Sequence, residues 1–101
     1  RLYAWLLEPP VRFRAKASRP FVPPGGTSAL DALPAFLAAQ QQVLGLVERT
    51  AGLDLAARKV PSAISASLRY NVYSSFLVFA AHERRHLWQA RRAALAVRER
   101  P

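Results

Sequence analysis

Cysteine and methionine are both absent from the 101-residue chain. The lack of cysteine excludes disulfides, thiolate nucleophiles and cysteine-ligated zinc sites, and it fits the reducing cytoplasm. Long apolar runs are missing as well, because none approaches the roughly 18 residues that a membrane-spanning helix needs. We therefore predict a cytoplasmic protein with no membrane partner. Since the chain begins at Arg1 without any Met, we also expect it to be the later part of a longer domain.

Acidic residues are scarce: 6 Asp and Glu stand against 15 Lys and Arg, which gives a net charge of +9. Such an excess of positive charge invites a nucleic-acid interpretation. The basic residues are mostly Arg, however, and they are spread along the whole chain. This usage is also typical of GC-rich genomes, in which Arg replaces Lys generally. Nucleic-acid binding is therefore only a minor alternative.

Apolar residues make up 51% of the chain and recur with helical spacing in three segments. The predicted helices are residues 1–8, where a helix ends before Pro9-Pro10, residues 28–51 and residues 67–98. Ser28 and Ser67 are suitable N-caps, and Gly52 is a suitable residue to follow the end of the second helix. The predicted fold class is all-α.

Two connectors separate these helices. Residues 9–27 are rich in proline and glycine, which excludes regular helix and predicts a long crossover along a helical bundle. Residues 52–66 form the second connector, in which we see no convincing strand pair. The whole chain is expected to form a single, partial domain.

The last helix is amphipathic at about 100° per residue. Its apolar stripe, predicted to be buried, consists of Leu68, Val72, Phe76, Phe79, Ala80, Leu87, Ala90, Ala94 and Val97. The opposite side, predicted to be solvated, carries Arg84, Arg85, Arg91 and Arg92. His82 and His86 lie at the margin of the stripe, and their i, i+4 spacing brings both imidazoles close enough for one metal ion.

A metal site at this pair needs further ligands, and the chain has no third histidine. Glu8, Asp31, Glu48 and Asp54 are carboxylates that could serve, but no spacing singles one out. The competing interpretation is that His82 and His86 are ordinary hydrogen-bonded residues at the edge of a helical face.

The string His82-Glu83-Arg84-Arg85-His86 also matches the H-E-x-x-H pattern of zinc proteases, in which the glutamate acts as a general base. We expect no strand before this helix to align a peptide substrate. Residues 87–92 also lack the glycine and the third histidine of the extended metzincin pattern. A protease is therefore a minor alternative, and no catalytic residue is assigned.

The segment Phe79-Ala80-Ala81-His82-Glu83-Arg84-Arg85-His86-Leu87-Trp88-Gln89-Ala90 resembles the last-helix signature of the DinB-like helical-bundle superfamily. One large branch of that superfamily commonly reads apolar-x-x-H-x-x-R-H-L-x-Q there. Residues 12–24 look like the basic, proline-rich crossover of the same branch, and residues 53–61 look like its approach to the last helix. The resemblance covers nearly the whole chain.

This resemblance implies a four-helix bundle with one long crossover, of which helix 1 and most of helix 2 are missing from the chain. It implies a zinc or nickel ion bound by three histidines, two of which match His82 and His86 while the third lies upstream of Arg1. Gln89, and more weakly Glu83, would support the ligands or line the pocket.

The predicted function is that of a divalent-metal-binding DinB-like protein, either a thiol-dependent transferase or a metal-dependent hydrolase. Its expected partners are a low-molecular-weight thiol, a small-molecule substrate and a second copy in a homodimer. The competing hypothesis is a binding or structural helical bundle without metal and without chemistry.

Overall fold

The computed structural model of the chain describes residues 2–14, 16–26, 28–63 and 65–101. It is mostly helical, and it divides into two compact units. One unit comprises residues 1–14 and 54–101, and the other comprises residues 15–53. Among the described residues, no helix combines the length and the apolar character that crossing a membrane requires.

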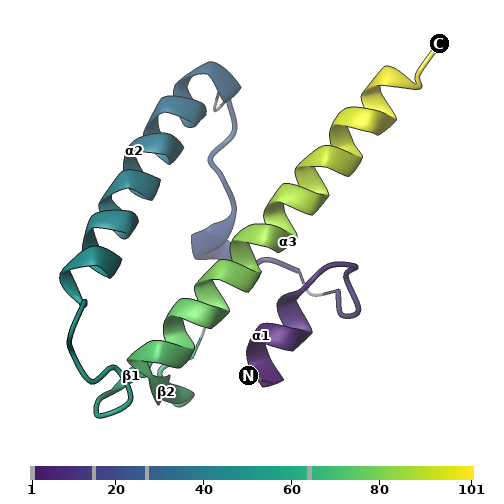
Figure 1. Cartoon of the computed structure of the whole chain (residues 1–101). Coiled ribbons are helices and arrows are strands. Elements are labelled where there is room, and N and C mark those ends of the chain that lie inside the picture. The colour runs from purple at the N-terminus through teal and green to yellow at the C-terminus, as the bar shows by residue number, and fades with distance from the viewer. Residues whose placement is uncertain (1, 15, 27, 64) are drawn as a thin grey trace. The chain divides into compact units, whose positions relative to one another are not determined.

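The first unit is built on two helices, α1 (Leu2–Leu7) and α3 (Val72–Arg98). The predicted end of a helix before Pro9 is confirmed. Figure 1 shows α1 alongside the first half of α3, against which it packs. Ala81 of α3 has no accessible surface, and its small side chain permits this close approach.

Two arginines of α3 hold the chain segment that includes α1. Arg84 forms an ion pair with Glu8, and its Nε donates to both carboxylate oxygens at 3.1 and 3.0 Å. Arg85 donates from Nη2 to the carbonyl oxygen of Phe13 at 2.7 Å. These side chains were predicted to be solvated. Arg84 is indeed exposed, at 53%, whereas Arg85 is half-buried, and both also bind the segment that includes α1.

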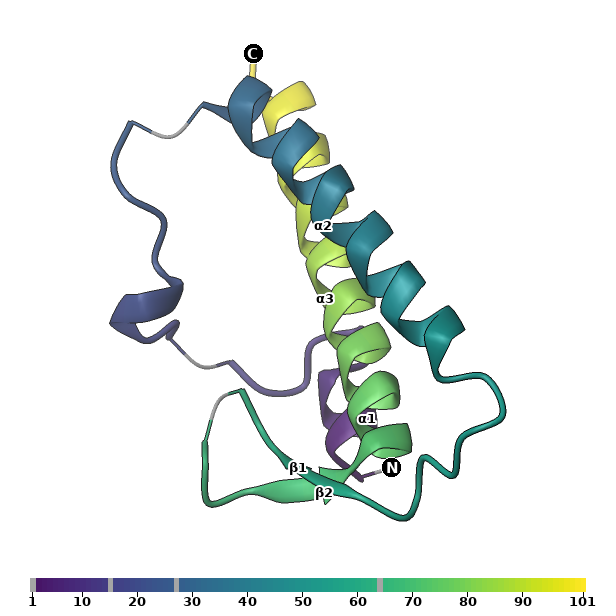
Figure 2. The same ribbon diagram turned by 90° about the vertical axis from the view of Figure 1, so that its left-hand side faces the viewer.

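A short antiparallel strand pair precedes α3, where none was expected. β1 (Lys59–Pro61) pairs with β2 (Arg69–Asn71), and Val60 lies opposite Tyr70. Both residue types favour strands. The ladder continues through a hydrogen bond from Ser62 N to Leu68 O at 2.7 Å. In Figure 2 the pair lies at the N-terminal end of α3.

This strand pair delays the start of the last helix, which was predicted at Ser67. Residues 69–71 are extended because their backbone groups bond to β1 and not to a helical turn. Asn71 is the observed N-cap, with φ −70° and ψ 164°, and its side chain accepts from Ser74 N at 2.8 Å. The hydroxyl of Ser67 instead lies 2.8 Å from that of Ser65.

The predicted apolar stripe of α3 is largely exposed in its C-terminal half. Leu87 and Val97 in that half have exposed fractions of 53% and 66%, while Phe79 in the first half is 38% exposed. The stripe was predicted to be buried against a partner helix. Instead, α1 covers the other side of α3, where Ala81 lies between Arg84 and Arg85.

The second unit contains a short 3-10 helix, η1 (Arg19–Phe21), and the long helix α2 (Ala29–Arg49). Ser28 caps α2 as predicted, since its hydroxyl accepts from Leu30 N at 3.1 Å. The helix ends at Arg49 with Thr50 as its C-cap, and Gly52 then adopts a φ of 80°, a left-handed conformation that glycine tolerates without strain. The predicted helix of residues 28–51 is therefore confirmed within two residues at its C-terminal end.

The first testable consequence concerns the start of α3. Replacing Asn71 with Ala removes the side chain that satisfies Ser74 N, and we expect a loss of about 1 kcal/mol in the free energy of unfolding. Ser67→Ala is the matched control, because Ser67 lies before β2, and it should cost clearly less. Urea unfolding followed by circular dichroism measures both. A larger loss of unfolding free energy for Ser67→Ala than for Asn71→Ala would indicate that the helix begins at Ser67, as the sequence predicted.

The second consequence concerns acid stability. Hydrogen bonding and charge attraction from Arg84 hold the pKa of Glu8 below its ordinary value. A lowered folded pKa stabilises the fold above the pKa of the unfolded carboxyl, and this stabilisation disappears as the pH falls through the folded pKa. Glu8→Gln should therefore lower the melting temperature near pH 7 and have little effect near pH 2.

Glu99→Gln is the control for this experiment, because Glu99 makes no ion pair among the described residues. Thermal melting at both pH values gives the comparison. Equal effects of Glu8→Gln at neutral and acid pH would contradict the role of the ion pair.

Candidate metal centre

The two histidines of the chain face each other on the surface of α3. Their Nε2 atoms are 2.8 Å apart, and their ring centroids are 4.4 Å apart with an interplanar angle of 77°. The i, i+4 spacing on a helix produces this arrangement, because residues four apart lie one above the other. The two residues that the sequence singled out are therefore brought together.

Gln89 extends the pair on the same helix. Its Oε1 lies 3.1 Å from Nδ1 of His86. Because Oε1 can only accept, the hydrogen bond requires a proton on Nδ1, which leaves Nε2 of a neutral His86 as an acceptor. His82 must then donate from its own Nε2. This chain of hydrogen bonds assigns one tautomer to each ring.

His82 is partly buried, and its pKa lies below the ordinary value for histidine. Burial is the main cause, because it disfavours the charged imidazolium, and the neighbouring His86 and Arg85 act in the same direction. Glu83 opposes them by raising the pKa of His82. A lowered pKa favours the neutral ring, which is the form that binds metal.

The pair can serve a divalent ion with a small rearrangement. With bonds of about 2.05 Å, Nε2 atoms 2.8 Å apart would subtend about 86° at the ion, and a tetrahedral angle needs a separation of about 3.3 Å. His86 already directs its unprotonated Nε2 toward the shared point. His82 must move its proton from Nε2 to Nδ1. The chemistry of the donor set therefore fits two ligands of a zinc or nickel site.

A complete set of protein ligands is not found in the part of the chain that the structure describes, where no group of three His, Cys, Asp or Glu comes together. Glu8 is held by Arg84, and Asp54 accepts from Ala56 N at 3.0 Å. These two carboxylates, considered from the sequence as further ligands, have other partners. Glu83 lies beside His82 and is half-buried.

The strand pair β1–β2 bears on the protease alternative. The expectation that no strand precedes the helix of His82-Glu83-Arg84-Arg85-His86 was wrong, because the sequence signal of two three-residue strands is too short to recognise. The two arginines inside this string hold Glu8 and Phe13, which gives them a structural role.

Two contacts of the site region were not predicted. Arg92 stacks over the ring of Trp88, with its guanidinium carbon 4.9 Å from the ring centroid. Arg12 stacks in the same way on Trp5, at 4.5 Å. The i, i+4 spacing of Trp88 and Arg92 could have indicated the first contact, whereas the second joins a helix to an irregular segment.

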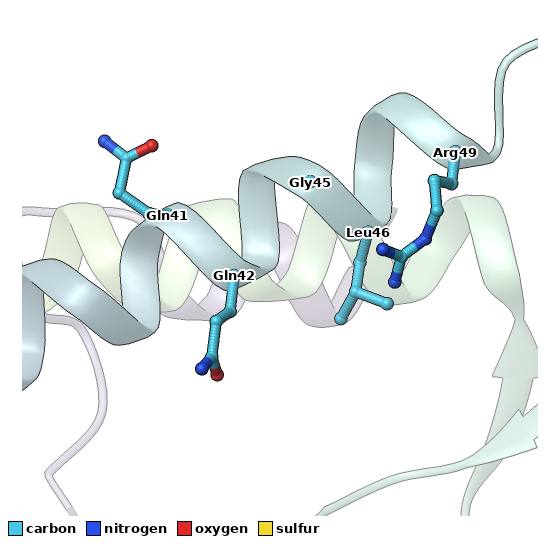
Figure 3. A pocket seen from close by; sticks show the side chains of 5 residues that line it. All are labelled: Gln41, Gln42, Gly45, Leu46 and Arg49. Carbon is cyan, nitrogen blue, oxygen red and sulfur yellow. The ribbon is translucent and has the colours of Figure 1, made fainter.

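A shallow hollow of about 520 Å³ lies on α2, a helix that contains no histidine. Its lining residues are Gln41, Gln42, Gly45, Leu46 and Arg49. Figure 3 shows that all of them belong to one helix and that Gln41 and Gln42 point in opposite directions. Ligand sites are usually enclosed by several elements, so this surface is not assigned as a site.

The tautomers of the pair are a direct test of the geometry. In the metal-free chain, at a pH where both rings are neutral, we expect the proton of His86 on Nδ1 and that of His82 on Nε2. Long-range ¹H–¹⁵N NMR correlations distinguish the two tautomers. Gln89→Leu should release His86 from this tautomer, while Gln41→Leu on α2 should not. A dominant Nε2–H tautomer of His86 in the unmodified chain would contradict the arrangement.

Comparison of the chain with models of known protein families, with curated proteins and with solved structures gives no significant match. The interpretation of the site therefore rests on its residues and their geometry.

Proposed function

We propose that the chain is a DinB-like metal-binding domain in which His82 and His86 hold one divalent ion, zinc or nickel. The observation that carries the proposal is the 2.8 Å separation of their Nε2 atoms. Two rings that present the same nitrogen to one point are suited to joint ligation. The last-helix signature of residues 79–90 supports the family assignment, and the mostly helical fold agrees with it.

Gln89 supports the proposal from the other side of the His86 ring. Metal-bound histidines commonly donate their second ring N–H to an acceptor, which fixes the tautomer and the orientation of the ring. The hydrogen bond of 3.1 Å between Nδ1 of His86 and Oε1 of Gln89 is of this kind. Gln89 is therefore a positioning residue for His86.

A divalent ion bound here supplies a Lewis acid that lowers the pKa of a bound thiol or water molecule. Two imidazole ligands leave coordination positions for such a molecule and for a substrate oxygen. His82 and His86 would hold the ion through Nε2. On this basis we propose thiol-dependent transfer to, or hydrolysis of, a small molecule, and we assign no catalytic residue beyond the ligands.

Metal titration tests the proposal against that of a structural bundle without metal. The chain is stripped of metal and titrated with zinc and with nickel by isothermal calorimetry. We expect binding that Gln89→Ala weakens by about 10–100-fold, as removal of a residue that orients a ligand usually does. His82→Ala and His86→Ala should weaken it further, because each removes a ligand.

Gln41→Ala is the control, since Gln41 lies on α2 in the other unit. It should bind metal like the unmodified chain. Undiminished affinity in both histidine variants would contradict the ligand assignment.

A further inference from the structure

The side of α3 next to the histidine pair is rich in hydrogen-bond donors. Arg85, Gln89 and Arg92 follow one another at spacings of four and three residues, so their side chains leave the helix on the same side. We name these three residues the donor face. At about 100° per residue, Gln89 lies between the histidine pair and the two arginines around the helix axis. The donor face therefore adjoins the candidate metal centre.

Gln89 joins the donor face to the histidine pair. Its Oε1 accepts the proton on Nδ1 of His86, at 3.1 Å. The NH2 group leaves the same amide carbon in another direction, so it points away from this hydrogen bond. It donates to no acceptor in the part of the chain that the structure describes. Two N–H donors of Gln89 are therefore free to bind a ligand beside the pair.

Arg85 contributes a guanidinium that is only partly used. Its Nη2 donates to the carbonyl oxygen of Phe13 at 2.7 Å, and no carboxylate among the described residues pairs with it. Its positive charge reaches the histidine pair, because it lowers the pKa of His82. Arg85 is also half-buried, so less water screens its attraction for an anion.

Arg92 lies two turns after Arg85 and is positioned by stacking. Its guanidinium carbon is 4.9 Å from the centroid of the Trp88 ring. Stacking occupies the flat side of a guanidinium and leaves the N–H groups at its edge for a ligand. Within the residues that the structure describes, Arg92 forms no ion pair. A guanidinium held in this way is suited to two parallel hydrogen bonds with a carboxylate or a phosphate.

The charge around the histidine pair is unevenly distributed. Glu83 lies on the other side of the pair from Arg85 around the helix axis. On the side of Arg85, the bound segment adds a further cation, since the exposed Arg14 directly follows Phe13. The net charge of +9 strengthens the attraction for anions generally. A ligand that approaches the pair from the donor face is therefore selected for negative charge.

We propose that the donor face binds an oxyanion group, a carboxylate or a phosphate, of the small molecule on which the metal site acts. This proposal rests on the proposed metal-binding function and specifies the class of its substrate. Arg85 and Arg92 supply guanidinium donors, and Gln89 supplies its NH2 group. The rest of the molecule then extends toward the ion that His82 and His86 hold.

Anion binding to the metal-free chain tests the donor face by itself. The chain is stripped of metal, dialysed and titrated with glutarate and, separately, with inorganic phosphate. NMR follows the side-chain N–H signals of Arg85, Gln89 and Arg92, and we expect saturable shifts with both anions. Arg92→Gln should weaken the binding of both by about tenfold, because hydrogen bonds from a charged donor are strong. Absence of saturable shifts would overturn the proposal.

Arg91→Gln is the matched control. It removes the same charge from an equally exposed residue, but Arg91 lies on the opposite side of the helix from Gln89. It should bind both anions like the unmodified chain, and circular dichroism verifies that both variants are folded. An equal loss of affinity in the two variants would show that only the overall charge attracts anions, and it would overturn the donor face.

The zinc-loaded chain tests whether the anion belongs to a substrate of the metal site. The chain is loaded with zinc, and unbound zinc is removed before titration with glutarate. Glutarate is a flexible dicarboxylate, so one carboxylate can bind the donor face while the other reaches the ion. We expect at least tenfold tighter binding than to the metal-free chain, and Arg92→Gln should weaken binding to both forms.

The other outcomes of this titration have distinct meanings. Equal affinity of glutarate for the zinc-loaded and the metal-free chain would overturn the link between anion and metal, and it would leave the metal-binding function intact. Undiminished binding of glutarate to zinc-loaded Arg92→Gln would show that the ion alone holds the anion, which overturns the donor face. A chain that takes up no zinc would overturn the proposed function and, with it, the assignment of the anion to its substrate.

A single-stranded oligonucleotide distinguishes the two sources of a phosphate group. On our proposal it binds the metal-free chain no more tightly per phosphate than inorganic phosphate does, and Arg92→Gln and Arg91→Gln affect it equally. Binding that is far tighter, and that Arg92→Gln weakens much more than Arg91→Gln, would assign the donor face to a nucleic acid. That result would overturn it as a substrate site.

Discussion

The ion pair of Arg84 with Glu8, together with the hydrogen bond from Arg85 to Phe13, is the constraint on which the first unit depends. α1 has only six residues, far fewer than the roughly 12–15 that an isolated helix needs, so it must be held by contacts. Both arginines lie between His82 and His86 in the sequence. The same turn of α3 therefore anchors α1 on one side and presents the imidazoles on another, which links the orientation of the site to the packing of the unit.

The strand pair acts on the same helix from its N-terminal end. Because residues 69–71 bond to β1, the helix cannot start earlier, and Asn71 caps it at that point. The strand pair fixes one end of α3, and α1 covers one side of it. These two contacts determine which surface of α3 stays exposed. It carries the histidine pair and Gln89 together with exposed apolar residues.

The helices, their proline and glycine ends and the pairing of His82 with His86 could be predicted from the sequence, because these features depend on local spacing. The N-cap at Ser28 was predicted for the same reason, and the structure confirms it. The strand pair and the true start of α3 could not, since a three-residue strand is defined by its distant partner and carries little pattern of its own. The side of α3 that α1 covers was also predicted wrongly. The periodicity of the sequence identifies the apolar side of α3. The segment that packs on α3 lies on the other side of the helix, where the long side chains of Arg84 and Arg85 bind it. The DinB-like bundle and the activity remain proposals, supported by the motif of residues 79–90.

The central claim is that His82 and His86 bind a divalent ion through Nε2, and X-ray absorption at the zinc edge tests it most directly. The account predicts that the zinc-loaded chain shows nitrogen ligands at about 2.0 Å with the outer-shell scattering of imidazole rings. A spectrum with oxygen ligands alone and no imidazole scattering would contradict the account.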